Sequence, residues 1–274
     1  MGENMKQIDV ATPWRKTAIA LYKAPSDSKT YGTFEIDFDN ALEFIQKKKE
    51  QGIKLTVTQV VASALAKSLE IDVPEINCYI KRGNIFPRED VSIFISVNIN
   101  KGKEMGGFVI RDMENKTVTD ISKEMAERVE KSRNKQDKGA VKNKNLLSKI
   151  PWPFRRMVFV IIKFITVNLG LSIKFLNVSP HSFGSAMISN IGTHGLQYGF
   201  AALFPASNIP VVLLLGKIEP KPVVRNGEIV IRNVLPLGAT LDHRIIDGGQ
   251  GGKVAKALTK YLSNPELLDK ISEE

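Results

Sequence analysis

The stretch Thr240–Gly249, TLDHRIIDGG, joins two segments with different patterns. A long apolar run typical of a strand comes before it, and beyond Gly248 the sequence KVAKALTKYLSNPELL has the spacing of a helix. His243 stands at the end of the apolar run, and Asp247 follows four residues later. Loops at strand ends are places where a rigid scaffold displays catalytic groups. Two interpretations are open here: a solvated, charged turn, or a histidine base presented by a strand.

The rest of the chain mixes strand and helix patterns. Alternating or continuous apolar runs predict strands at residues 31–38, 76–87, 91–99, 106–112, 184–192, 209–220 and 223–241. Apolar residues at helical spacing predict helices at residues 40–52, 56–72, 117–136 and from 248 onwards. Asn40 and either Thr56 or Thr58 are the predicted caps of the first two helices. Hairpin turns are predicted at Gly83-Asn84 and at Asn226-Gly227.

This order of elements predicts the fold class. Strands and helices do not alternate strictly, which favours helices packed on a mixed sheet over a purely parallel one. The apolar runs are mostly continuous, so at least one face of the sheet is buried. We therefore expect an α/β fold, a two-layer sandwich of helices on a mixed β-sheet. A chain of 274 residues has the length for a single domain spanning residues 1–274.

The composition excludes several classes of protein. The chain is 43% hydrophobic and 25% charged, as is ordinary for a globular protein, and its first residues do not resemble a secretory signal. The single Cys78 rules out an internal disulfide framework and suits a reducing cytoplasm, where we expect the protein. No pair of cysteines or close pair of histidines has metal-ligand spacing, so we expect no metal site.

The positive charge is concentrated in one window. The formal net charge is +10, and residues 131–174 hold eleven Lys or Arg against one acidic residue, Asp137. The remainder of the chain is close to neutral. A basic surface is therefore local, and no nucleic-acid reading element accompanies it, so we expect no nucleic-acid partner.

His243 is the residue best suited to acid–base chemistry. The unperturbed pKa of histidine, about 6.5, lets it act as a base near neutral pH, provided that its ring is held in a fixed direction. Asp247 would brace this loop by holding an arginine. Gly248 and Gly249 would let the backbone turn sharply there.

The sequence DHRIIDGGQGGKVAKAL (242–258) resembles the C-terminal signature of the dihydrolipoamide acyltransferases, the core subunits of 2-oxoacid dehydrogenase complexes. Chloramphenicol acetyltransferase shares the His-x-x-x-Asp-Gly part and the fold. Upstream segments are similar to further segments of the family in the same order. They are LTVTQVVASALAKSL (55–69), VPEINCYI (73–80), GGFVIRD (106–112) and MISNIG (187–192).

The resemblance implies a coenzyme A-dependent acyltransferase that moves an acyl group between coenzyme A and a lipoamide-type thiol by direct attack. His243 would be the general base, and Ser189 matches the hydroxyl that stabilises the oxyanion. Asp247 matches an aspartate that pairs with an N-terminal arginine, for which Arg15 is the candidate. Arg244 and Gly248 would give structural support.

The resemblance also implies partners. Relatives form their active site between the subunits of a homotrimer, with coenzyme A as co-substrate. No Asp-Lys-Ala lipoylation segment is present, so a lipoyl group would come from a separate lipoyl-domain protein, or coenzyme A would serve another acceptor. Two rival functions are a catalytically silent scaffold subunit of the same fold and an O-acyltransferase of the antibiotic-modifying type.

The resemblance is broken by a basic and apolar insertion at about residues 138–182. Its segment WPFRRMVFVIIKFITVNLGLSIKFL (152–176) is interrupted too often by lysine to span a bilayer. Three interpretations are open: a buried helix or helix pair at a subunit contact, a peripheral membrane anchor through about residues 150–176, or a cap over the substrate channel.

Overall fold

The computed structural model describes residues 28–99, 104–133, 150–151, 154–176 and 178–271. A mixed sheet forms its centre, with strand order β1-β9-β7-β6-β4-β5 and with β8 paired to β9. β4, β6 and β7 run parallel to one another, and the other pairs are antiparallel. The strands are β1 (Lys29–Asp37), β4 (Ile93–Ile99), β5 (Glu104–Ile110), β6 (Ala186–Asn190), β7 (Val211–Leu215), β8 (Glu219–Arg225) and β9 (Glu228–Asp242).

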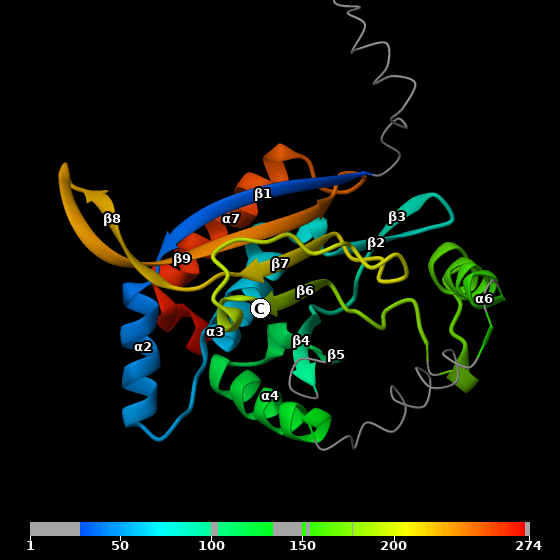
Figure 1. Cartoon of the computed structure of the whole chain (residues 1–274), viewed down its shortest axis with the longest axis horizontal. Helices are drawn as coiled ribbons and strands as arrows, with labels where there is room; N and C mark the ends of the chain where they lie inside the picture. The colour runs from blue at the N-terminus through cyan, green and yellow to red at the C-terminus, as the bar shows by residue number, and fades with distance from the viewer. Residues whose placement is uncertain (1–27, 100–103, 134–149, 152–153, 177, 272–274) are drawn as a thin grey trace, which may run out of the picture.

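Four helices cover one face of this sheet (Figure 1). The main core lies between the two layers and includes Leu65, Ile121, Leu213 and Leu258, which are nearly inaccessible to solvent. A smaller apolar cluster on the opposite face, around Val212, is covered by the connection between β6 and β7. The predicted two-layer sandwich is thus confirmed. The covering helices are α2 (Asp39–Glu50), α3 (Val57–Lys67), α4 (Val118–Arg133) and α7 (Gly248–Ser263).

Local sequence signals account for several element ends. Thr56 caps α3 in a capping box with Gln59, as predicted. The turn between β8 and β9 lies at Asn226 and Gly227, with φ of 51° and 85°, and confirms the predicted hairpin. The strands β2 (Cys78–Lys81) and β3 (Asn84–Pro87) form the other hairpin, whose turn lies one residue earlier than predicted, at Arg82-Gly83.

The predicted cap at Asn40 is wrong. Helix α2 begins at Asp39, and Phe38 takes the cap position without a side-chain hydrogen bond. Asn40 instead donates from Nδ2 to the carbonyl oxygen of Ser263, 2.8 Å away, at the end of α7. A contact with a distant element has overridden the local preference.

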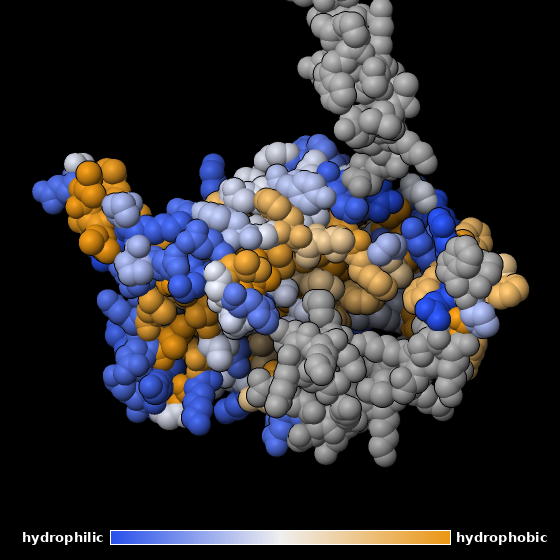
Figure 2. All heavy atoms as spheres, viewed as in Figure 1, coloured by the Kyte–Doolittle hydropathy of each residue, from blue (hydrophilic) through white to orange (hydrophobic). Residues whose placement is uncertain are grey.

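Two features project from the body. Strand β8 and the first half of β9 form a ribbon beyond the sheet (Figure 1), and the apolar side chains of Val224, Ile229 and Ile231 on it are 71–78% exposed. Figure 2 shows an orange, hydrophobic patch on this ribbon, just behind its hydrophilic tip. The second feature is α6 (Phe154–Lys163), which lies apart from the sheet beside the β2–β3 hairpin. No helix in the described ranges is both long and apolar enough to cross a membrane.

The loop after β6 passes very close to the sheet. A Cβ atom added at Gly238 in β9 would overlap the carbonyl oxygen of Gly199, whereas one added at Gly32 in β1 would meet nothing. We expect Gly238→Ala to lower the free energy of unfolding by about 1–3 kcal/mol, because backbone atoms would have to move apart. Gly32→Ala is the matched control and should change the stability by less than about 1 kcal/mol. Urea unfolding of both variants checks this, and equal effects would contradict the close approach.

Candidate active site

The His243 turn connects β9 to α7. β9 ends at Asp242, residues 243–245 form the turn, and Ile246 is fully buried in the core, which anchors the segment. The backbone N–H of His243 donates to the carbonyl oxygen of Ser28, 2.8 Å away. The imidazole itself is exposed and is hydrogen-bonded to no residue of the described chain. The turn is therefore fixed through its backbone, while the ring faces solvent.

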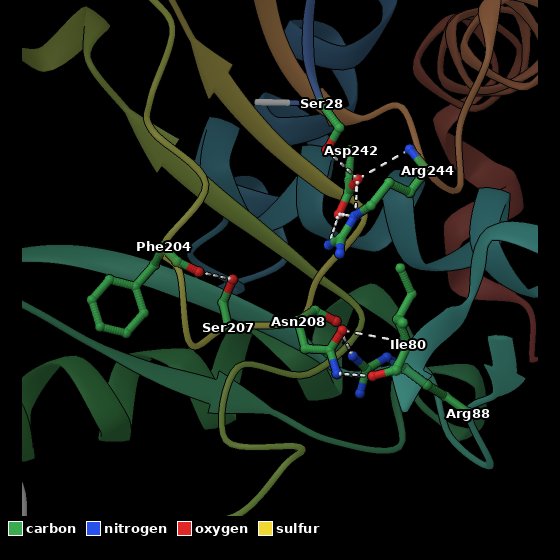
Figure 3. A network of polar contacts seen from close by, with 8 residues as sticks. All are labelled: Ser28, Ile80, Arg88, Phe204, Ser207, Asn208, Asp242 and Arg244. Carbon is green, nitrogen blue, oxygen red and sulfur yellow. Dashed lines mark hydrogen bonds and ion pairs between the residues drawn. The ribbon is translucent and has the colours of Figure 1, made fainter. Parts of the chain in front are cut away.

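An ion pair flanks this histidine on both sides. Arg244 binds the carboxylate of Asp242 through Nε, 2.9 Å from Oδ1, and Nη2, 2.5 Å from Oδ2. Ser28 donates to the same carboxylate at 3.1 Å, so the chain just before β1 closes the cluster (Figure 3). The side chains on either side of His243 point to one another and hold the turn in shape.

The pair also sets the charge of Asp242. Burial alone would raise the pKa of this carboxyl group, but hydrogen bonds from the side chain and backbone of Arg244 outweigh it and leave the pKa below its usual value. The hydrogen bond to Asp242 raises the pKa of Arg244 in turn. Asp242 is therefore ionised at neutral pH beside the histidine.

Asp247 and Gly248 both belong to the N-terminal end of α7. Asp247 Oδ1 accepts from the backbone N–H groups of Gly249 and Gln250, at 2.7 and 3.3 Å, and so caps α7 in a capping box. Among the described residues it binds no arginine, and the candidate partner Arg15 lies outside them. The sharp turn expected at Gly248, in contrast, is not found. Its φ is not left-handed, because the residue already belongs to the first turn of α7, and a Cβ there would meet open space.

Ser189 lies near the C-terminal end of β6 and is half-buried. It lines a cavity of about 1170 Å³ together with Thr58, Ser96, Asn190 and His194. Asn190 at the strand end donates to the Thr58 hydroxyl, 3.2 Å away. The Ser189 hydroxyl is bonded to no other group in the part of the chain that the structure describes, so it remains open to a ligand.

The structure does not bring His243 and Ser189 together within one chain. Ser189 pairs with Leu214 in β7, and Leu214 pairs with Gly238 in β9. From Gly238, β9 runs antiparallel to β6 for five more residues to reach His243. With strands ~4.8 Å apart and a rise of ~3.3 Å per residue, the two residues are about 19 Å apart. Each chain thus carries two separate parts of the predicted site.

A cavity of about 580 Å³ lies beside the Asp242 cluster. The basic side chains of Lys29, Arg82, Lys163 and Arg244 line it, and Asp242 is the one acidic residue among the described residues of its wall. Lys163 comes from the end of α6, so the predicted insertion contributes to this wall.

The opposite wall of this cavity is braced by Asn208. Its side chain bonds both the N–H and the carbonyl group of Ile80, at 3.1 and 2.8 Å, and its φ is 53° (Figure 3). Arg88 donates to the carbonyl oxygen of Asn208 at 2.7 Å and to His181 Nδ1 at 3.0 Å. Burial lowers the pKa of Arg88 to about 10 and also lowers the pKa of His181, which agrees with a neutral imidazole accepting from the guanidinium.

The sequence did not single out Asp242 or Asn208. The charged neighbours of His243 are visible in the motif, but the pattern does not tell which carboxylate Arg244 binds. One property of the sequence could have indicated Asn208: asparagine tolerates a left-handed backbone conformation better than most residues.

Comparisons with known proteins now add to this geometry. A family model described as 2-oxoacid dehydrogenases acyltransferase (catalytic domain) matches residues 4–140 and 175–269. The chain is 28% identical over 235 residues to the dihydrolipoyllysine-residue acetyltransferase component of the pyruvate dehydrogenase complex of Staphylococcus epidermidis. That match covers 84% of this chain and 44% of the relative, so the chain spans less than half the length of this relative.

Solved structures share the fold. A probable dihydrolipoamide acetyltransferase from Listeria monocytogenes superposes with a TM-score of 0.63 at 18% identity, over 100% of this chain and 99% of that one. The dihydrolipoamide acetyltransferase of Azotobacter vinelandii gives a TM-score of 0.63 at 18% identity, over 88% of this chain and 83% of that one. At this identity the likeness concerns the fold.

The ion pair beside His243 gives a testable pH dependence. We expect Asp242→Asn to lower the free energy of unfolding by about 1–3 kcal/mol at neutral pH, because a charge-assisted bond is lost. The pKa of Asp242 is lowered by folding, so this difference from the wild-type protein should persist above the unfolded-state pKa of about 3.9 and disappear as the pH falls through the folded-state value.

Urea unfolding between pH 3 and pH 7 measures the difference. Glu228→Gln, an exposed carboxylate on the β8–β9 ribbon, is the control and should show almost no difference at any pH. A difference for Asp242→Asn that does not shrink in acid would contradict the assigned ion pair.

Proposed function

Because the chain belongs to the acyltransferase family of the 2-oxoacid dehydrogenases, represented by their catalytic domain, we propose that it transfers an acyl group between coenzyme A and a lipoamide-type thiol. The observation that carries this proposal is the exposed imidazole of His243, held by its backbone at the end of β9 beside a cavity wall. The lipoyl group would be carried by another protein or by another part of the polypeptide.

The chemistry follows from the groups at hand. A free thiol has a pKa near 8.5, so it needs a base at neutral pH. His243 takes the thiol proton as the sulfur attacks the thioester carbonyl carbon, and a tetrahedral oxyanion forms. The hydroxyl of Ser189 donates to that oxyanion. The bond to the original sulfur then breaks, and His243 returns the proton to the leaving thiolate.

The Azotobacter vinelandii structure supports these roles. A serine, a histidine and an asparagine have roles in the catalytic mechanism of that protein. In that protein the asparagine stands four positions after the histidine, as Asp247 does here, and the serine precedes the histidine by a stretch similar in length to the one between Ser189 and His243. In our proposal Asp247 positions His243 by capping α7, and its pairing with Arg15 stays a prediction.

The cavity beside Asp242 suits the anionic parts of coenzyme A. Phosphate groups are bound well by arginine and lysine, and Arg82 and Lys163 reach this cavity from two different segments. We assign the coenzyme A phosphates to this wall, with the thiol end directed towards His243.

The complete site would form between copies of the chain. His243 and Ser189 are about 19 Å apart within one subunit by strand geometry, which is too far for one reaction centre. A neighbouring copy would bring its Ser189 to the His243 of the first. The exposed apolar ribbon of β8 and β9 is a surface that such contacts would cover. We propose a cyclic trimer of this kind.

The proposal predicts a loss of turnover in His243→Ala. We expect kcat to fall by about 10²–10⁴-fold when coenzyme A and acetyl-dihydrolipoamide are the substrates, because no other group would take the thiol proton. Lys256→Ala, an exposed residue of α7, is the control and should retain wild-type turnover. Turnover unaffected by loss of His243 would refute the mechanism, and no turnover by the wild-type chain would favour a scaffold role or another acceptor.

The shared site predicts complementation between two inactive variants. When His243→Ala and Ser189→Ala chains are co-expressed in equal amounts, about one quarter of the intersubunit sites in a cyclic oligomer receive both intact residues. We therefore expect activity to return to about one quarter of the wild-type value, although each variant alone is inactive. If both residues acted within one chain, mixing would restore nothing.

A further inference from the structure

Among the described residues, those that hold helix α6 to the rest of the molecule lie along one side of it. Ile162 is its one nearly buried residue among those described, and Thr166 in the following turn donates to the carbonyl oxygen of Ile162. The turn is tied to the β2–β3 hairpin by the N–H of Arg82, which donates to the carbonyl oxygen of Asn168 at 3.0 Å. The inner side of α6 therefore contacts the protein, whereas no described residue covers its outer side.

The outer side carries an apolar stripe. Residues spaced three or four apart lie on one face of a helix. The five members of this stripe are each between 49% and 60% exposed: Phe154, Met157, Val160, Ile161 and Phe164. A helix of a globular protein normally turns such a face towards the core. Here it faces away, so the stripe requires an apolar partner.

The charge around the stripe narrows the choice of partner. Arg155, Arg156, Lys163 and Lys174 are exposed in and near α6, and residues 150–182 contain no Asp or Glu. A second α6 packed face to face would bring like charges together, which is unfavourable. An anionic lipid surface offers negative headgroups beside an apolar layer, which matches both properties of this helix.

We propose that the outer face of α6 docks on a membrane surface that contains anionic lipids. The helix lies in the plane of the interface, with its apolar stripe among the acyl chains and with Arg155 and Arg156 at the headgroups. The helix lies at the edge of the molecule, away from the sheet (Figure 1), and the side chains of its stripe are exposed. This docking is independent of the acyl-transfer proposal.

Co-sedimentation of the full chain with vesicles tests the docking. We expect binding to phosphatidylcholine vesicles containing phosphatidylglycerol, weaker binding to phosphatidylcholine alone, and a decrease with salt. Phe164→Glu and the double variant Arg155→Glu/Arg156→Glu should each lower the partition coefficient at least about tenfold. Ile71→Glu, at a side chain that is 49% exposed and lies outside α6, and Lys256→Glu on α7 are the matched controls and should bind like the wild-type protein.

Two results would overturn the proposal. One is binding that is absent, or that the α6 variants and their controls share equally. The other is dissociation of the oligomer by Phe164→Glu in sedimentation velocity without a change in vesicle binding, which would make the stripe a contact between copies. Thermal unfolding of each variant ensures that a loss of binding is not a loss of folding, and acyl transfer measured without vesicles should be unchanged.

Discussion

The hydrogen-bonded pairing of β9 is the constraint on which the remaining structure depends. This strand pairs with β1, β7 and β8, so it joins the edge strand β1 to the rest of the sheet and extends beyond the sheet in one direction. One end continues into the exposed ribbon, and the other delivers His243 to the surface. Because β9 runs antiparallel to β6 and β7, it carries His243 away from Ser189. The division of the site between two ends of the sheet is a consequence of this strand direction.

The parts of the fold that depend on local chemistry were predictable from sequence. The helix cap at Thr56, one of the two predicted candidates, and the predicted Asn226-Gly227 turn need only a few neighbouring residues, and both are present. Asn40 is not the cap because the helix already begins at Asp39, and its amide nitrogen instead donates to Ser263, which is remote in sequence. The two-layer architecture also follows from the pattern, since continuous apolar strands and amphipathic helices have few other ways to bury their surfaces.

The arrangement of the candidate site was not predictable from the sequence, and the catalytic roles of its residues stay predictions. The motif pointed to His243 and Asp247, yet the structure uses Asp247 as a helix cap and gives Arg244 to Asp242. Which of two nearby carboxylates binds an arginine depends on where the side chains point, and sequence spacing does not specify this. The separation of Ser189 from His243 depends on strand order, a non-local property that no single segment contains.

The α6 segment and the turn after it border a cavity on one side and carry an apolar stripe on the other, and this has a thermodynamic consequence. Lys163, Val167 and Asn168 line the cavity beside Asp242, while the apolar stripe on the same segment faces outward. Because the same segment borders the cavity and carries the stripe, ligand binding in the cavity and partner binding at the stripe can influence each other. A ligand in the cavity that favours one position of this segment changes the affinity of the outer face for its partner by some factor. The partner then changes the affinity of the cavity for that ligand by the same factor.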